Sequence, residues 1–574
     1  MDTARSSASQ RAFVYALTVL SLLATPVVSN AQTSGAGHDS ALAQIEQLFE
    51  QQHWPEVVRT VEALSFRNAD VDYYYGSAFA QLGRWQEARG AFLHGRELQP
   101  RDKRFPIELG GVAYKQNRYR EAAAWLRDGL QIDPNDSYAS DFLATIYFVQ
   151  GNLEAALKYW NRINKPFIEE IHTGRELKIS PALLDHSFAF APLDVLRQTD
   201  LLTSDRRLQG LGIFTSYHLS LVAREDKKFD VNFQAQERNG AGNGMWQSLL
   251  SIFRGLPYQT IYPEYFNIGG HAMNFSSLVR WDAQKRRVSA SFSSPLENNP
   301  KYRYQLGLDL RNENWDIRRS FTAPAPLLGS LNLRREAVGG SIAGFNSGRW
   351  GWSTGAEFSH RDYRSVFSES PLNPSLLLTG YELKHLAEFN YQILRIPEQR
   401  LLLQSKLSSQ IAAIWANPRK TFEKLQGQVS GAWLPQMRGN DYRIRETLSA
   451  GATFGHAPFD ELFMLGLERD NDLWMRAHIG TRDGRKGSAP LGSNYILSNW
   501  EIDKRVYDNG IFNVKLSPFL DTGRINGPTG LGSQKWLSDT GIQVKASVLG
   551  VGVTFTYGKD LRSGNNAFYV TTTR

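Results

Sequence analysis

Apolar and polar residues alternate at every second position through much of the chain after Gly240. The segments 287–293, 303–311 and 551–558 each place apolar side chains at alternate positions, with charged, hydroxyl or glycine residues between them. A period of two residues predicts β-strands that have one apolar face. A soluble β-sandwich alternates as well, but each apolar face then needs a second sheet to cover it. Segments of about ten residues with short and long connections are typical of a transmembrane barrel.

Residues 242–574 are therefore predicted to form a transmembrane antiparallel β-barrel. At roughly twenty residues for each strand and its connection, the barrel has about sixteen strands. No stretch after the N-terminus has eighteen uninterrupted apolar residues, so any membrane residence requires a barrel and not helices. Aromatic residues that could form girdles at the two membrane interfaces are Trp281, Trp315, Trp350, Trp352, Trp415, Trp433, Trp500 and Tyr557.

Residues 1–31 have the three parts of a secretory signal peptide. Arg5 and Arg11 give a basic start, residues 13–28 form an apolar core, and residues 29–31 supply a small-x-small cleavage site. A membrane-anchoring helix is the alternative, but Pro26 and several hydroxyl residues shorten the apolar run below spanning length. We expect this segment to be cleaved.

Two features of the composition exclude whole classes of function. The chain has no cysteine, which excludes disulfides, thiolate metal sites and cysteine nucleophiles. The net charge is +8, but the 65 Lys and Arg residues are scattered among 57 acidic residues. A nucleic-acid partner would need a clustered basic patch, so none is expected.

A 34-residue period runs through residues 38–166, which is the period of tetratricopeptide repeats. Small residues that let the two helices of a repeat approach closely recur at this step: Gly76, Gly110 and Ala144 on the first helix, and Ala88, Ala122 and Ala156 on the second. Phe92, Leu126 and Trp160 keep the same step and are expected to fill the space between successive repeats. Three repeats that follow a shortened unit are enough for a stable solenoid, whose concave surface suits a peptide or protein.

Residues 168–238 break this period. We predict the end of a strand at 188–190, short helices over 192–202 and 205–212, and alternating strands at 217–222 and 229–233. This strand–helix–helix–strand–strand order resembles a POTRA domain, the periplasmic module that precedes the barrel in the BamA-type family. The resemblance implies an edge strand that can accept an extended segment by β-augmentation. A purely structural linker domain is the alternative.

A long charged connection follows Glu461 and interrupts the strand pattern. Loops of this length inside a compact domain are usually functional or disordered. The apolar residues Leu473, Trp474 and Met475 argue against disorder. A charged loop between strands can lie inside a wide barrel, where its charges pair with polar wall residues away from lipid.

The order of segments after residue 188 resembles the BamA-type outer-membrane assembly and secretion superfamily, also called bacterial surface antigen barrels. The segments that carry the resemblance are Phe266–Gly270, Arg286–Leu296, Phe463–Gly466, Leu473–His478, Pro518–Gly523 and Asp539–Gly541. The resemblance implies that the loop folds back into the barrel and that its arginine contacts the inner wall. Arg476 is the matching arginine, and we expect it to pair with Asp521 or Glu501. Because Ala477 replaces the family's glycine, Arg482 and Arg485 are the alternatives.

Catalytic and metal motifs are weak. Residues 351–355 fit the pattern G-x-S-x-G, but that motif requires a strand-to-helix turn and Ser353 lies in an alternating strand. The residues around His360, up to Arg364, are interpreted as a loop or rim. His271, His456 and His478 show no metal-ligand spacing, and residues 468–472 lack the calcium-loop pattern. We therefore expect no enzyme activity, no metal and no cofactor.

These features predict an α+β multidomain protein in the outer membrane of a diderm bacterium, with its N-terminal domains in the periplasm and lipid around the barrel. The helical array would capture a periplasmic client or accessory protein, the POTRA-like module would pass it on, and the barrel would insert or export it. Two alternatives are a secretion porin that exports a polysaccharide or lipoprotein, and a barrel hydrolase that acts on lipids.

Overall fold

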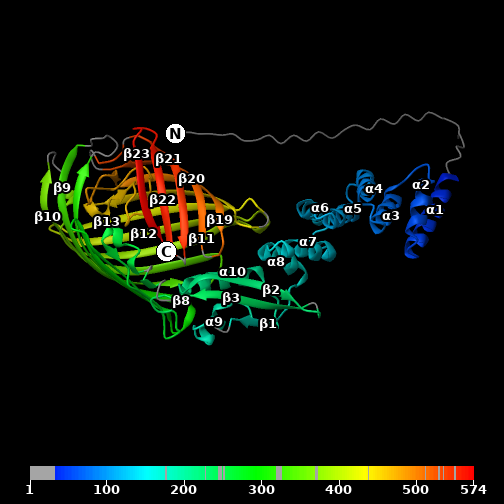
Figure 1. Cartoon of the computed structure of the whole chain (residues 1–574), viewed down its shortest axis with the longest axis horizontal. Coiled ribbons are helices and arrows are strands. Elements are labelled where there is room, and N and C mark those ends of the chain that lie inside the picture. Colours follow the sequence, from blue (N-terminus) through cyan, green and yellow to red (C-terminus); the bar gives the residue numbers. More distant parts are fainter. Residues whose placement is uncertain are drawn as a thin grey trace, which may run out of the picture. The chain divides into compact units, whose positions relative to one another are not determined.

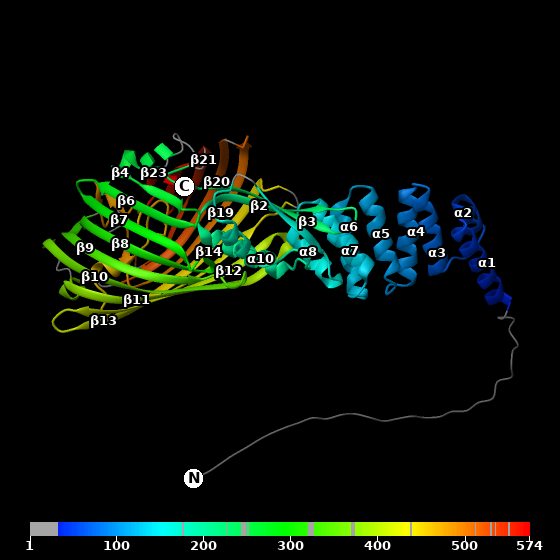
Figure 2. The ribbon, with the colours of Figure 1, turned by 90° about the horizontal axis from the view of Figure 1, so that it is seen from below.

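The structure is a computed structural model, which describes residues 33–574 except 175–176, 227, 243–247, 250–251, 319–325, 369–372, 437–438, 511, 528–530, 534, 549–550 and 574. The predicted signal peptide, residues 1–31, lies outside the described residues. The chain divides into two compact units, Met1–Asp133 and Pro134–Arg574. Figure 1 and Figure 2 show helices in the first part of the chain and strands in the rest.

Helices occupy the described chain up to residue 160. They are α1 (Thr33–Glu50), α2 (Trp54–Glu62), α3 (Ala69–Gln81), α4 (Trp85–Leu98), α5 (Arg104–Lys115), α6 (Tyr119–Ile132), α7 (Ser137–Val149) and α8 (Leu153–Trp160). Helices α4, α6 and α8 begin 34 residues apart, at Trp85, Tyr119 and Leu153. The predicted period of helix pairs is therefore present. The first compact unit ends before α7, so the last pair belongs to the unit that contains the barrel.

Small residues let the two helices of each pair approach closely, as predicted. A Cβ on Gly76 of α3 would lie 2.6 Å from the ring of Phe92 on α4, and one on Gly110 of α5 would lie 2.9 Å from Leu126 Cγ on α6. Phe92 and Leu126 thus pack within a pair, and not between pairs as expected. Between α4 and α5, the ring of Phe105 fits over Gly95 instead. The four alanines of the repeat (Ala88, Ala122, Ala144 and Ala156) are fully buried.

A small three-stranded module follows. It comprises β1 (Ile168–Thr173), α9 (Pro181–Ser187), α10 (Gln198–Leu211), β2 (Phe214–Ala223) and β3 (Phe229–Glu237). The sheet order is β1-β3-β2, with β1 parallel and β2 antiparallel to β3. The order of element types, strand–helix–helix–strand–strand, is as predicted, but α9 lies where no helix was predicted.

Two predicted positions in this module are wrong. The first strand is β1 and not residues 188–190, because Phe188 lies after α9 and packs 5.4 Å from the ring of Phe233 in the core. One helix, α10, replaces the two predicted short helices, because Thr203 and Ser204, which lie between them, continue the helix to Gly212, where it ends with a left-handed φ of 69°.

The remaining strands form a closed barrel of eighteen segments among the described residues. They are β4 (Thr260–Ile261), β5 (Glu264–Ile268), β6 (Met273–Trp281), β7 (Lys285–Leu296), β8 (Asn299–Arg318), β9 (Leu327–Gly344), β10 (Trp350–Ser368), β11 (Gly380–Ile396), β12 (Leu401–Trp415), β13 (Lys420–Trp433), β14 (Tyr442–Gly455), β16 (Thr481–Arg482), β17 (Arg485–Lys486), β19 (Asn494–Asp508), β20 (Phe512–Asn526), β21 (Leu537–Val548), β22 (Val551–Asp560) and β23 (Asn566–Thr573). The short hairpin β16–β17 belongs to a loop, and β4 and β5 pair with β6 in one continuous register, as two parts of one strand. Fifteen wall strands therefore remain among the described residues, close to the predicted number of about sixteen.

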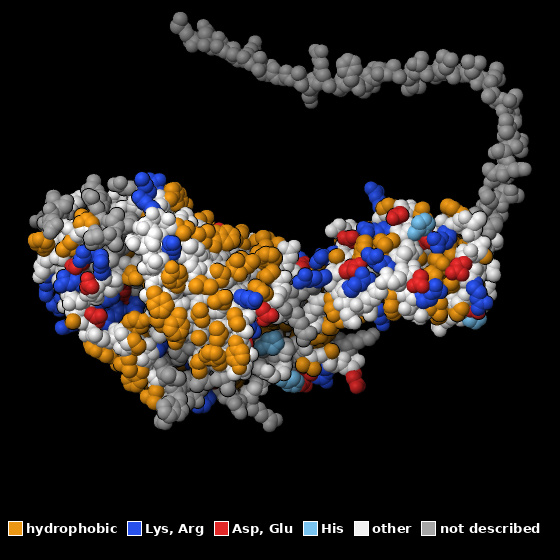
Figure 3. Space-filling model, turned by 45° about the horizontal axis from the view of Figure 1, so that its top comes forward, with side chains coloured by type: hydrophobic (Ala, Val, Ile, Leu, Met, Phe, Trp, Pro, Cys, Tyr) orange, Lys and Arg blue, Asp and Glu red, His pale blue; other side chains and the backbone are white. Residues whose placement is uncertain are grey.

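The outer face of the barrel is apolar. Leu306 and Leu308 of β8 are 55% and 42% exposed, and Trp433 and Trp500 are 43% exposed. Figure 3 shows hydrophobic side chains gathered over the strands. An apolar surface of this extent requires an apolar surrounding. Trp315, which the sequence predicts for a girdle, instead lies inside, where its ring packs 5.1 Å from Phe459. No helix in the described ranges is long and apolar enough to cross a membrane.

Candidate functional site: the inward loop of the barrel

Residues 456–493 leave the barrel wall and form what we call the inward loop. Strands β14 and β19, which flank it in sequence, pair directly with each other in the wall. The loop contains a 3₁₀ turn (Phe459–Glu461), β15 (Phe463–Met464), the hairpin β16–β17 and β18 (Leu491–Gly492), which pairs with β15. Lys486 of the hairpin pairs with Trp315 of β8. The loop is therefore held against the inner wall.

Apolar residues anchor the middle of the inward loop. Leu465 and Met475 are completely buried, and they cluster with Leu497, Ile525 and Leu537 of the wall strands. Burying side chains of this size stabilises a site by about 1.5–3 kcal/mol each. A second apolar cluster packs Phe459, Leu462, Met464 and Leu491 of the loop against Trp315, Ile317, Leu331 and Leu333 of the wall. The charged contacts of the loop form three groups.

The first group is centred on Arg476. Its guanidinium donates from Nη2 to Asp521 Oδ1 of β20 and from Nη1 to Glu501 Oε2 of β19, both at 2.7 Å. The backbone N–H of Arg476 also donates to Asp521, at 3.0 Å. Its Cζ lies 3.9 Å from the centre of the Phe519 ring, a cation–π contact. Both carboxylates are those that the sequence predicted.

The loop backbone approaches the wall closely at this point. A Cβ on Gly558 of β22 would lie 2.9 Å from the Arg476 carbonyl oxygen and 3.4 Å from Ala477 Cα. Any other residue at position 558 would therefore push the loop away from β22. The absence of a glycine at position 477 does not prevent docking, because the wall supplies the space.

His478 lies beside Arg476 and faces two further carboxylates. Its Nδ1 is 3.0 Å from Asp539 Oδ2 of β21, and its Nε2 is 3.7 Å from Asp560 Oδ2 of β22. Asp539 also accepts a hydrogen bond from the Ala477 N–H, at 2.6 Å. All three side chains are at most 7% exposed as residues. Sequence spacing could not reveal this cluster, since its members come from a loop and two strands.

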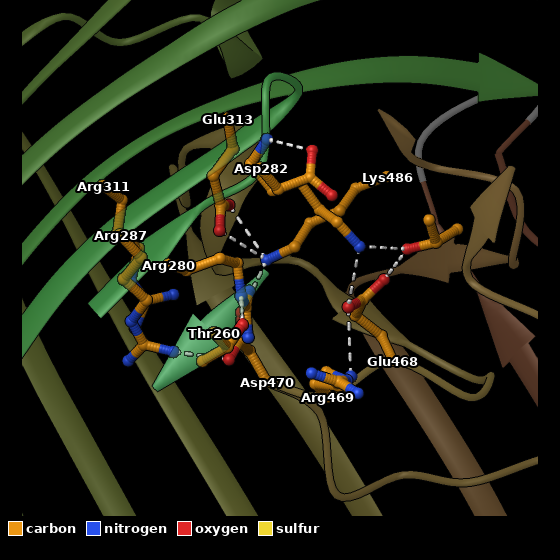
Figure 4. A network of polar contacts seen from close by, with 12 residues as sticks. Thr260, Arg280, Asp282, Arg287, Arg311, Glu313, Glu468, Arg469, Asp470 and Lys486 are labelled. Atoms are coloured by element: carbon orange, nitrogen blue, oxygen red, sulfur yellow. Dashed lines mark hydrogen bonds and ion pairs between the residues drawn. The ribbon is translucent and has the colours of Figure 1, made fainter. Parts of the chain in front are cut away.

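The second group joins the loop to β6, β7 and β8 (Figure 4). Lys486 Nζ lies 2.8 Å from Glu313 and 3.1 Å from Asp470. Asp470 also pairs with Arg280 and Arg287. Lys486, Glu313 and Asp470 are almost completely inaccessible, so each charge depends on its partners here.

The third group surrounds Glu461 at the start of the loop. Its carboxylate lies 2.5 Å from Lys384 Nζ, 3.5 Å from Arg361 Nη2 and 3.8 Å from Lys424 Nζ. Arg361 is 0% exposed and pairs with Glu382 of β11 at 2.9 Å. The interpretation of Arg361 as a rim residue is therefore wrong, because it lies on β10 with its side chain toward the loop. Arg364, with a 52% exposed side chain, does lie outside the buried network.

The contact with Asp521 and Glu501 is made by Arg476, and the two alternative arginines differ. Arg485 also contacts the inner wall, since it pairs with Asp316 of β8 at 3.0 Å, whereas Arg482 is exposed on β16. Between them, Asp483 and Gly484 both have positive φ, 52° and 79°. This is the geometry of a type I′ hairpin turn, for which Asp-Gly is a favoured sequence. The Asp-Gly pair was therefore an available signal for the hairpin.

A cavity of about 800 Å³ remains in the lumen beside the loop. Trp474 and Arg476 of the loop line one side of it, and polar wall residues line the other, among them Gln410, Gln426 and Gln428. Ser353 lies within β10, so the strand-to-helix turn that a nucleophile elbow requires is not formed there. His360 is also on β10, where its ring contacts Tyr381.

No protein-family model and no curated protein matches the chain. Solved structures that resemble it include BamA from Haemophilus ducreyi lacking POTRA domains 1–3, at 13% identity and a TM-score of 0.42, covering 71% of this chain and 84% of that one. CdiB from Escherichia coli has 13% identity and a TM-score of 0.43, covering 71% and 75%. MamA has 18% identity and a TM-score of 0.21, and the match covers 22% of this chain and 74% of MamA. The barrel fold is established by the strand pairings within this chain, independently of these similarities.

Proposed function

We propose that the chain is an outer-membrane protein of the BamA type, which captures a periplasmic client and inserts it into the outer membrane or moves it across. The observation that carries this proposal is the docking of Arg476 on Asp521 and Glu501 inside a closed barrel. A passive pore does not need a buried loop that is held by ion pairs on several sides, because such a loop reduces the open cross-section.

The preceding domains would supply the client. Successive helix pairs of a repeat array stack on one another and form a surface that can bind a peptide or protein. In the three-stranded module, β3 is central and both β1 and β2 are edges. An extended client segment can add to such an edge through main-chain hydrogen bonds. We place these domains in the periplasm and the barrel in outer-membrane lipid, and we propose that the protein has no enzymatic activity.

A second candidate is a secretion porin for a polysaccharide. The lumen cavity favours it, because amide side chains such as Gln410 and Gln426, beside the indole of Trp474, can bind a hydrophilic chain. The two candidates differ in what the buried loop should do. Loop docking is central to client assembly, whereas in a porin the loop only narrows the passage.

The deciding experiment compares Arg476→Ala with Arg364→Ala in a strain that lacks the native protein. Arg364 is the matched control, since its pair with Asp362 is largely exposed and contributes about 0–1 kcal/mol. The composition of the outer membrane and of the secreted material is measured for proteins and for polysaccharide. Heat-modifiable migration of each variant verifies that its barrel has formed.

We expect Arg476→Ala to deplete specific proteins from the outer membrane or the exterior, while Arg364→Ala behaves as the native chain. Loss of polysaccharide alone would favour the porin. Native behaviour of Arg476→Ala, with loop and barrel both formed, would overturn the proposed role of the loop.

A further inference from the structure

Three carboxylates stand in a row on the inner wall. Asp521, Asp539 and Asp560 occupy directly opposite positions on β20, β21 and β22. They are 0%, 0% and 3% exposed. Like charges that face each other across an antiparallel pair are destabilising, and a buried carboxylate without a counter-charge is more costly still. The row therefore requires positive charge from outside the strands.

Arg476 supplies that charge for Asp521 only, and it shares its guanidinium with Glu501. Asp539 accepts a hydrogen bond from the Ala477 N–H, and Asp560 accepts hydrogen bonds from the Arg562 N–H and the Ser563 hydroxyl. These donors are dipoles and not full charges. Oδ1 of Asp539 is buried and has no hydrogen-bond partner among the described residues. Two adjacent carboxylates are thus left with one imidazole beside them.

We propose that His478, Asp539 and Asp560 bind a divalent transition-metal ion, with zinc as the expected species. One ligand atom from each residue lies within 4.8 Å of the other two. The two carboxylates approach different nitrogens of the ring: Asp560 Oδ2 lies 3.7 Å from Nε2, and Asp539 Oδ2 lies 3.0 Å from Nδ1, at hydrogen-bond distance. Ligand atoms around a tetrahedral zinc ion, at bond lengths of about 2.1 Å, are roughly 3.4 Å apart. The Nε2–Asp560 separation is close to this value, so Nε2 and Asp560 are the expected ligand pair, and Asp539 holds the ring through Nδ1 and adds its charge beside the ion.

The donor types select the metal class. A mixed imidazole and carboxylate set suits zinc and its first-row neighbours, whereas calcium and magnesium favour oxygen ligands alone. With its ring between two carboxylates, the imidazole can bind the ion through one nitrogen while the other donates to a carboxylate, as metal-bound histidines usually do. The ion would tie the inward loop to β21 and β22. This site is independent of the proposed function.

The test uses the purified full chain in detergent after treatment with a chelator. Zinc chloride is titrated and bound zinc is measured after dialysis. We expect one zinc ion per chain, at least a 100-fold loss of affinity in His478→Gln and Asp560→Asn, and a 10- to 100-fold loss in Asp539→Asn. His271→Gln is the matched control, because His271 contacts Asn298 in a turn away from this cluster. We expect it to bind zinc as the native chain does.

Heat-modifiable migration shows whether each variant retains its barrel. A native chain that binds no zinc would overturn the proposal, and so would folded His478→Gln or Asp560→Asn variants that bind it as tightly as the native chain. If these variants do not fold, cobalt(II) is titrated into the native chain. Visible absorption that zinc abolishes supports a mixed nitrogen and oxygen site, and a chain without such absorption overturns it.

Discussion

The helix pairs and the inward loop are held by different kinds of contact, and the partners in these contacts lie at different distances along the chain. Gly76 and Gly110 contact side chains of the next helix, Phe92 and Leu126, and the contacts are apolar. The inward loop also has apolar contacts with the wall, but it adds buried ion pairs, and its partners are remote: Lys486 and Glu313 are 173 residues apart. Local apolar packing therefore closes the helix pairs, whereas the loop combines long-range apolar packing with long-range ion pairing.

This difference predicts how each region fails. An apolar contact loses stability in proportion to the misfit, usually by a few kcal/mol. A buried ion network responds more sharply, because removing one partner leaves the other charge buried and unpaired. The loop should consequently be more sensitive to single substitutions than the helices, although the strands around it persist.

The largest effect is expected for Glu461→Ala. This change removes the carboxylate that Lys384, Arg361 and Lys424 share. Lys384 and Arg361 keep Glu382, whereas Lys424 loses the one carboxylate with which it pairs among the described residues. Loss of one partner from such a group costs about 3–5 kcal/mol. Limited proteolysis and hydrogen exchange of the loop amides should show the loop released, while heat-modifiable migration shows that the barrel remains.

Glu336→Ala is the matched control in the same barrel, because the Arg334–Glu336 pair is 49% and 42% exposed. Exposed pairs contribute about 0–1 kcal/mol. Equal protection of the loop amides from hydrogen exchange in Glu461→Ala and Glu336→Ala would contradict this prediction, because buried and exposed charges would then contribute equally to loop stability.

Next in size is Leu306→Arg on the outer face of β8, where the native side chain is 55% exposed. A lipid-facing arginine destabilises a barrel by about 2–4 kcal/mol at the membrane midplane and by less near the interfaces. Gln305→Arg on the inner face, which lines a lumen pocket, is the control. The folded fraction in lipid vesicles is read from heat-modifiable migration in urea. A smaller loss from Leu306→Arg than from Gln305→Arg would contradict a lipid-facing outer surface.

The sequence was most informative where the determining contacts are periodic. The 34-residue step located the helix pairs, and the two-residue alternation located the barrel strands. Arg476 and its carboxylate partners were also predicted, but from a family resemblance and not from spacing. The helices of the small module were misplaced because α9 and α10 are too short, or too polar, for a clear apolar stripe.

The other loop partners could not be predicted, because they depend on which strands the closed barrel brings opposite the loop. Arg361 was misjudged for this reason. In sequence it stands in a polar run that resembles a rim, whereas in the barrel it faces Glu382 and Asp460. The cluster of His478, Asp539 and Asp560 likewise exists only through the strand register that sets two aspartates side by side.

A third prediction tests the apolar side of the comparison with two neighbouring glycines of α5. Gly110→Phe places a ring where even a Cβ would lie 2.9 Å from Leu126. We expect it to lower the free energy of unfolding of a fragment of residues 38–166 by about 1–3 kcal/mol. A Cβ on Gly111 would meet no atom within 4 Å outside the backbone of its own helix and its chain neighbours, so Gly111→Ala should raise that free energy by about 0.5–1 kcal/mol. Urea unfolding followed by far-ultraviolet circular dichroism measures both, and a fragment without helix would refute the repeat.

The smallest effect concerns Glu108 on α5, a largely buried carboxyl that forms no ion pair with the described residues. Burial raises the pKa of the Glu108 carboxyl on α5 above its ordinary value. The folded state therefore holds this proton at pH values where the unfolded chain has released it. Stability from this group is complete below the unfolded pKa of about 4.3 and is lost as the pH rises through the folded pKa. In Glu108→Gln this loss should disappear, so the free energy of unfolding of the variant should rise relative to that of the native fragment as the pH rises from about 4 to about 7.

Urea unfolding of the 38–166 fragment across this pH range measures the difference in the free energy of unfolding. Parallel pH profiles would show that the helical unit accommodates a charge as readily as the inward loop does, and the contrast between the two regions would then rest on distance along the chain alone.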